Sequence, residues 1–159
     1  MKTKLSFVLL ALILFGNLFA QDSLSYSKNN LYLELLGNGG FGSINYERVS
    51  RGKVYFRLGG SVLPASSCSG LDFSRLTYLM ITGAGILINI YKDSHLEMGA
   101  CTTIPIFYER NDSEIIITGV FGYRLQPMDS GFFLRITGLA FYVEHQFYFW
   151  PGLSLGYNF

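Results

Sequence analysis

Charged residues are scarce in this chain of 159 residues: they make up 14% of it, whereas about 25% is usual for a soluble domain. The formal net charge is +1, which provides neither the basic field of a nucleic-acid-binding protein nor an acidic tail. No apolar run reaches the roughly 20 residues that a membrane-spanning helix needs. These absences argue against a nucleic-acid partner and against a helical membrane protein.

Cysteine and histidine are also rare, with two residues of each. Two thiols without a nearby histidine cluster are too few for a structural zinc site. Cys68 lies in a polar link and Cys101 in an expected strand, and these contexts do not favour a disulfide between them. We therefore expect no bound metal and no cofactor.

The N-terminus has the three parts of a secretory signal peptide. Two lysines precede an apolar run over residues 5–15, and Ala20 stands directly before a polar stretch. The apolar run is too short to be an anchor helix. We expect cleavage after Ala20, so that residues 1–20 are a signal peptide and residues 21–159 form one domain outside the cytoplasm.

Half of the residues are hydrophobic and 16% are aromatic, and beyond residue 28 the apolar ones alternate with polar or small ones. Strict alternation is typical of strands with one apolar face. The segment 76–91 is nearly all apolar; its length and its glycines favour a long strand, but the pattern does not identify its inward-facing side chains. The expected strands cover residues 30–37, 41–49, 53–63, 76–91, 95–106, 115–126, 131–142 and 148–159.

Short turns and longer polar links alternate between these eight strands. The turns cover residues 51–52, 93–94 and 128–130, and the links cover residues 64–75 and 109–114. The short link at 37–40 departs from this arrangement. Short turns at one end and longer loops at the other are typical of bacterial outer-membrane barrels. The expected fold class is all-β, an eight-stranded antiparallel up-and-down transmembrane barrel.

Six charged residues indicate which face of the sheet points inward. They lie mid-strand on the less apolar side, towards the turn end: Glu34, Glu47, Glu97, Arg57, Arg124 and Arg135. A soluble barrel would hold its apolar face inside, but that face mixes large aromatics with small residues and suits a closed interior poorly. A membrane barrel directs the polar side into the lumen. Three acids and three arginines at similar depth would then neutralise one another, so we expect a plugged lumen and no general pore.

Several segments, in order, resemble the small outer-membrane β-barrel proteins of Bacteroidetes-type, Gram-negative bacteria: LYLELLGNGGFGSINYERV, HLEMGA, GYRLQP, GFFLRI and PGLSLGYNF. The resemblance covers most of the mature chain and is weakest in the loops and in 76–91. It implies an eight-stranded barrel in the outer membrane, surrounded by its lipid and inserted by the outer-membrane insertion machinery. That machinery reads a C-terminal aromatic strand, which assigns the assembly signal to Leu155, Tyr157 and Phe159. The resemblance supplies no catalytic residue.

Two motifs suggest enzymatic chemistry. Residues 37–42 fit the G-x-G-x-x-G fingerprint of dinucleotide sites, but a strand rather than a helix is expected after them, so we interpret them as a hairpin turn. His145 lies beside Glu144, and the serines of the 64–75 link make Ser–His–Glu chemistry on lipid acyl chains conceivable. A surface histidine and solvated serines are the simpler interpretation.

The aromatic cluster at residues 141–150 favours a girdle at the lipid–water boundary, with loop-mediated adhesion as the alternative. Taken together, the sequence predicts a monomeric integral outer-membrane barrel with a structural or surface-interaction role and no enzymatic activity. The alternatives are a lipid-modifying enzyme of the outer leaflet and a soluble secreted ligand-binding barrel.

Overall fold

The computed structural model describes residues 28–50, 53–67, 70–107, 115–127, 129–143 and 146–159. The expected signal peptide, 1–20, lies outside these ranges. The strands are β1 (Asn29–Leu36), β2 (Gly42–Val49), β3 (Val54–Ser67), β4 (Gly70–Tyr91), β5 (Ser94–Phe107), β6 (Ile116–Leu125), β7 (Gly131–Val143) and β8 (Gln146–Asn158). No helix in the described ranges is long and apolar enough to cross a membrane.

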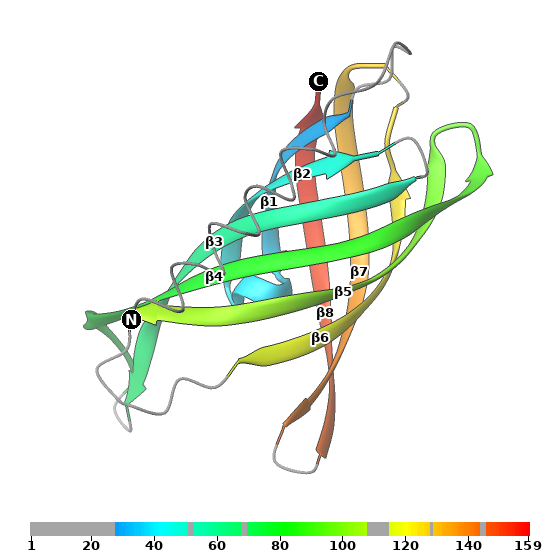
Figure 1. Cartoon of the computed structure of the whole chain (residues 1–159). Coiled ribbons are helices and arrows are strands. Elements are labelled where there is room, and N and C mark those ends of the chain that lie inside the picture. The colour runs from blue at the N-terminus through cyan, green and yellow to red at the C-terminus, as the bar shows by residue number, and fades with distance from the viewer. Residues whose placement is uncertain (1–27, 51–52, 68–69, 108–114, 128, 144–145) are drawn as a thin grey trace, which may run out of the picture.

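Each strand pairs antiparallel with the next along the chain, and β8 pairs with β1, so the sheet closes into a barrel (Figure 1). Closure leaves no free edge at the level where β1 and β8 run together, from Asn30↔Asn158 to Leu36↔Gly152. The prediction of an all-β, eight-stranded antiparallel barrel is confirmed.

The expected polar link at 64–75 was wrong, because most of it is strand. β3 continues to Ser67 and β4 begins at Gly70, with a register shift between Pro64 and Ala65. Proline cannot donate to a regular ladder, and a bulge is one of the places where a sheet accommodates it. The two strands therefore continue past the proline instead of ending at it.

The inward side chains of the segment 76–91 of β4, which the sequence left open, are the odd-numbered ones. Leu79, Ile81 and Leu87 are buried, whereas Ile86 and Ile88 are exposed. Apolar residues occupy both faces of this strand, which is why alternation could not identify the inner one.

On every strand most outward side chains are apolar, and many of the large ones are exposed. One residue from the middle of each strand illustrates this outer belt, with 46–61% of each side chain exposed: Leu33, Ile44, Leu58, Ile86, Met98, Phe121, Ile136 and Leu155. The polarity of the barrel is thus inverted relative to a soluble domain, since the six charged residues in the middle of its strands are buried inside.

The connection between β1 and β2 turns into the lumen and forms a short 3₁₀ helix, η1 (Gly37–Gly39), seen in Figure 1 as a small coil among the strands. Its residues are buried and lie close to strands on all sides of the barrel. Gly37 and Gly40 have φ of 73° and 72°, a region that favours glycine. A Cβ on Gly37 would also collide with the Glu34 side chain. The glycine-rich motif therefore builds an inward turn followed by a strand.

Candidate functional site in the barrel lumen

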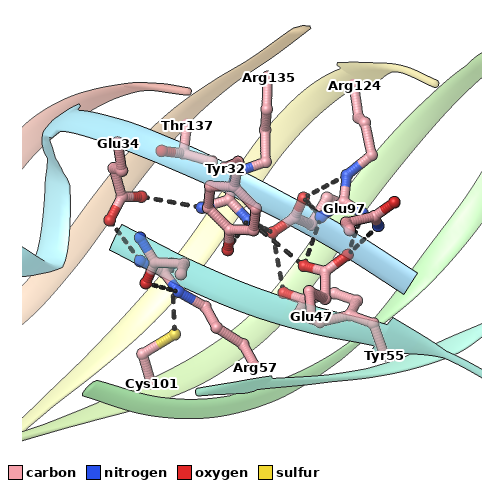
Figure 2. A network of polar contacts seen from close by, with 12 residues as sticks. Tyr32, Glu34, Glu47, Tyr55, Arg57, Glu97, Cys101, Arg124, Arg135 and Thr137 are labelled. Atoms are coloured by element: carbon pink, nitrogen blue, oxygen red, sulfur yellow. Dashed lines mark hydrogen bonds and ion pairs between the residues drawn. The ribbon is translucent and has the colours of Figure 1, made fainter. Parts of the chain in front are cut away.

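The six predicted charges come from six different strands and meet inside the barrel (Figure 2). Alternate residues of a strand point to the same face, and each of the six stands at a position that faces inward. Arg57 is 3% exposed, and the other five are fully buried: Glu34, Glu47, Glu97, Arg124 and Arg135.

Arg124 joins two acids, Glu47 and Glu97. Its Nη1 contacts Glu47 Oε1, and its Nη2 lies 2.9 Å from Glu47 Oε2. The same guanidinium donates to Glu97 Oε2 from Nη2 at 2.7 Å and from Nε at 3.1 Å. Such forked, charge-assisted hydrogen bonds are the strong ones, so this arginine ties β6 to both β2 and β5.

Arg135 touches all three acids. Its Nη2 lies 2.8 Å from Glu34 Oε1, and its Nη1 lies 3.3 Å from Glu97 Oε1 and 3.6 Å from Glu47 Oε2. Arg57 contacts Glu34 as well. Each carboxylate therefore has two arginine partners, and the three acids and three bases form one connected, neutral network.

Neutral side chains complete the network, and sequence reasoning did not identify them. Tyr55 donates its hydroxyl to Glu97 Oε1 at 2.9 Å, and Asn30 donates to Glu47 Oε1 at 2.9 Å. The Tyr32 ring stacks under the Arg135 guanidinium, 4.8 Å from centroid to Cζ. Such a cation–π contact adds to the desolvated pairs.

A usable signal for these neutral partners existed in the sequence. Tyr32 stands two residues before Glu34, and Tyr55 two residues before Arg57. In a strand, residues two apart share a face, so a side chain two positions from a luminal charge must face the lumen too.

Glycines on the inner face make room for these large side chains. A Cβ on Gly99 would lie 2.5 Å from the Tyr55 hydroxyl oxygen, and one on Gly85 would lie at the same distance. A Cβ on Gly156 would collide with Tyr32 and would lie 2.6 Å from Phe133 Cε1. The narrow lumen is filled by large residues whose neighbours in the sheet are glycines, as Gly85 is to Tyr55 and Gly156 is to Tyr32.

The described part of the lumen is dominated by ion pairs. Cys101 is a free, buried thiol whose Sγ lies 4.0 Å from Arg57 Nη1. Among the described residues, no group of three His, Cys, Asp or Glu side chains is placed to hold a metal ion. The chemistry that the described part of the lumen supports is therefore charge neutralisation between strands.

The three residues of the predicted assembly signal lie on the outside of β8. Leu155, Tyr157 and Phe159 are exposed, and the Tyr157 ring makes an edge contact with Phe132 on β7, with ring centroids 5.5 Å apart. The backbone of Phe159 exchanges two hydrogen bonds with that of Asn29, at 2.9 and 3.1 Å. The terminal residue is therefore part of the β8–β1 seam.

Cys68, Glu144 and His145 lie outside the described residues, and so does Ser69. The structure consequently gives no distances that bear on the Ser–His–Glu hypothesis. The sequence predicted that the aromatic residues of 141–150 form one girdle on the outer surface. This prediction was incomplete, because strand pairing places some of these side chains on the outer face of the sheet and others on its inner face. Tyr142 and Phe147 form one pair, and Phe141 and Tyr148 form a stacked pair on the other face.

The inner-facing set continues the luminal side of β7 and β8, so a girdle on the outer surface accounts only for the outer set. Phe141 follows Leu139 in step along β7, and Trp150 pairs with Leu139 from β8. Leu139 is 1% exposed, whereas Trp150 is 43% exposed.

No protein-family model matches the chain, and no curated protein matches it. A solved structure that is similar is the backbone structure of the Yersinia pestis outer membrane protein Ail in a phospholipid bilayer nanodisc. The TM-score is 0.48 and the sequence identity is 12%, over 83% of this chain and 99% of Ail. At this identity the similarity concerns the fold, and the resemblance to Bacteroidetes-type barrels stays a prediction.

Proposed function

We propose that this protein is an integral outer-membrane β-barrel. The observation that carries the proposal is the inverted polarity: Glu34, Glu47, Glu97, Arg124 and Arg135 are fully buried in the lumen, while the outer belt is apolar on all eight strands. Exposed apolar patches on soluble monomers seldom exceed a few hundred Å². A belt around the whole barrel is suited to lipid, which disfavours the soluble secreted barrel.

Strand length and closure support the same proposal. A transmembrane strand needs about 9–11 residues, and six of the eight strands have between 10 and 22. A closed barrel pairs the backbone groups that lipid could not satisfy. Export by the signal peptide in a Gram-negative cell completes this proposal.

The role that suits this lumen is structural or surface-directed. The neutral network of three acids and three arginines, together with η1, occupies the section through which solutes would have to pass, and this supports a plugged barrel rather than a general pore. We propose that the protein has no enzymatic activity and that its luminal carboxylates serve to pair with the arginines. The partners would be outer-membrane lipid and, during assembly, the insertion machinery, with the barrel acting as a monomer.

Membrane fractionation tests the proposal. The protein should be recovered in the outer-membrane fraction, resist extraction by carbonate, and migrate faster on a gel before boiling than after it. Its circular dichroism in detergent should be that of β-sheet. Recovery in the soluble periplasmic or extracellular fraction, with unchanged gel mobility, would contradict it.

A further inference from the structure

The lumen has two different halves, with η1 between them. On one side lies the charge network. On the other side the inner-facing side chains that the structure describes carry no charge, and most are apolar. We call this half the upper lumen and define it by Leu63, Leu79, Ile116, Leu139, Tyr148 and Trp150.

Contacts at η1 fix the position of two of these residues, Leu63 and Ile116. A Cβ on Gly40 would lie 2.8 Å from Leu63 Cδ2, so Leu63 packs directly on the end of the turn. Ile116 pairs with Thr103, whose hydroxyl donates to the Asn38 carbonyl in η1 at 3.4 Å. Ile116 and Trp150 are 37% and 43% exposed although they face inward. The upper lumen thus offers accessible apolar surface.

On one side of the upper lumen the barrel wall is low, meaning that the strands there end earlier than the other strands. β1 and β2 have eight residues each, fewer than the 9–11 that span a bilayer. Pairing between β8 and β1 stops at Gly152, and pairing between β3 and β2 stops at Gly60. Beyond these points β8 is paired with β7 and β3 with β4, while the described strands supply no partner on the other side.

The lip of this low wall is apolar. Residues 35–46 contain no charged side chain. Leu35, Leu36 and Phe41 at the turn are 59%, 38% and 60% exposed. A loop that reaches the aqueous surface would be polar, as the longer outer loops of membrane barrels are. This lip is suited to lie among acyl chains, below the level of the other strand ends.

From these observations we infer that an acyl chain of an outer-leaflet lipid enters the upper lumen between β3 and β8 and lies over η1. This inference rests on the proposed membrane function. The part of the inner wall whose side chains the structure describes carries no charge and would contact the chain, and the low lip makes that wall continuous with the lipid around the barrel. An acyl chain in the upper lumen is favourable because it covers apolar wall that would otherwise contact water, such as Ile116 and Trp150.

An added peptide strand is the other occupant that open edges attract. Both edges disfavour it. Pro64 stands on the open part of β3 and Pro151 on the open part of β8, and each removes a backbone donor that strand addition would use. Prolines on open edges are a known way of preventing such pairing.

Trp150 is the one tryptophan of the chain and lies at the β8 side of the opening, so it reports on the occupant directly. The test reconstitutes the purified protein in phosphatidylcholine vesicles whose acyl chains carry bromine near their middle, a contact quencher of tryptophan fluorescence. A Leu153→Trp reporter in a Trp150→Phe background serves as the matched probe, because Leu153 is exposed on the outer belt.

We expect brominated lipid to quench Trp150 to an extent comparable with the Leu153→Trp reporter. Ile116→Glu places a charge in the upper lumen, where burying it against an acyl chain is costly, so it should abolish the quenching of Trp150 and leave the outer reporter unchanged. Ile116→Leu should retain the quenching. Ile116→Gln provides a second polar variant if the glutamate prevents folding, as judged by gel mobility.

Quenching of the outer reporter without quenching of Trp150 would overturn the inference while leaving the membrane proposal intact. Quenching of Trp150 that Ile116→Glu and Ile116→Gln leave unchanged would also overturn it, because lipid would then reach the ring from outside the barrel. If the outer reporter itself is unquenched, the membrane proposal fails and the inference fails with it.

Discussion

Arg124 on β6 and Glu47 on β2 lie 77 residues apart in the chain and meet across the lumen, with Arg124 Nη2 2.9 Å from Glu47 Oε2. β6 and β2 are not neighbours in the sheet, so no backbone pairing joins them. The contact is therefore one that only a closed, narrow barrel can make. It braces opposite walls, and both partners are fully buried.

The first prediction follows from that brace. Arg124→Leu leaves Glu47 and Glu97 with Arg135 alone, and removing one partner from a buried pair costs about 3–5 kcal/mol. Urea unfolding of the refolded protein should show a loss of this size. The double variant Arg124→Leu, Glu47→Gln should recover part of it, because one unpaired carboxylate is gone. An unfolding free energy that Arg124→Leu leaves unchanged would mean that the lumen is wet enough to screen the charges.

The Tyr55 hydroxyl provides a milder test of the same network. Tyr55→Phe removes the hydrogen bond to Glu97, and a bond to a charged group contributes about 1.5–3 kcal/mol. Tyr123 is the matched control, because its hydroxyl donates to Ser94 Oγ at 3.0 Å on the exposed side of the barrel. Urea unfolding should show a clear loss for Tyr55→Phe and little change for Tyr123→Phe. Equal effects would contradict a special role for the luminal bond.

Glycine packing predicts a position-dependent cost for alanine. Gly99→Ala places a Cβ 2.5 Å from the Tyr55 hydroxyl and 2.6 Å from the Ala84 carbonyl oxygen, so it should destabilise the fold by about 1–3 kcal/mol, as overpacking does. Gly119→Ala is the control, since the nearest atom to its Cβ is the Ala140 carbonyl oxygen at 3.6 Å. Thermal or urea unfolding should separate the two variants. A Gly99→Ala protein as stable as the parent would show that Tyr55 moves freely.

The C-terminal residue is expected to govern assembly more than stability. Deletion of Phe159, or Phe159→Asp, should sharply lower the amount of barrel assembled in the outer membrane while export continues. Tyr157→Ser should have a smaller effect, because it leaves the terminal ring in place. Quantitative immunoblots of outer-membrane and periplasmic fractions measure both quantities. Normal outer-membrane levels of the Phe159 deletion would reduce the terminal ring to one more outer side chain.

Much of the fold could be read from the sequence because the barrel obeys a period of two. Glu34 and Arg135 lie on strands in which apolar residues alternate regularly with polar ones. Their inward direction therefore followed from the pleat. The two side chains meet in one network because of the register between the strands, and the sequence of a single strand does not determine that register. Their distances depend on the stagger of the whole barrel, and only closure fixes it.

The remaining features depend on tertiary context. Leu79 and Ile86 are both apolar, and only closure of the barrel, which leaves them 8% and 46% exposed, distinguishes inner from outer on β4. Residues 64–75 are polar enough to predict a link, yet β3 and β4 extend through most of them because a bulge absorbs Pro64. The turn at Gly37 was recognised as a turn, but its inward direction depends on the space that the lumen leaves for it.

The central claim is that the outer belt faces lipid while the charges face one another inside. Phe121, 56% exposed near the middle of β6 and three residues from Arg124, tests it most directly. The measurement is the unfolding free energy of Phe121→Arg in lipid vesicles, compared with Phe121→Leu. If the belt lies in the bilayer, arginine should cost about 2–4 kcal/mol, as it does at the midplane of membrane barrels, while leucine should cost little. An arginine variant as stable as the leucine variant would contradict the account, because it would place the outer face of this barrel in water.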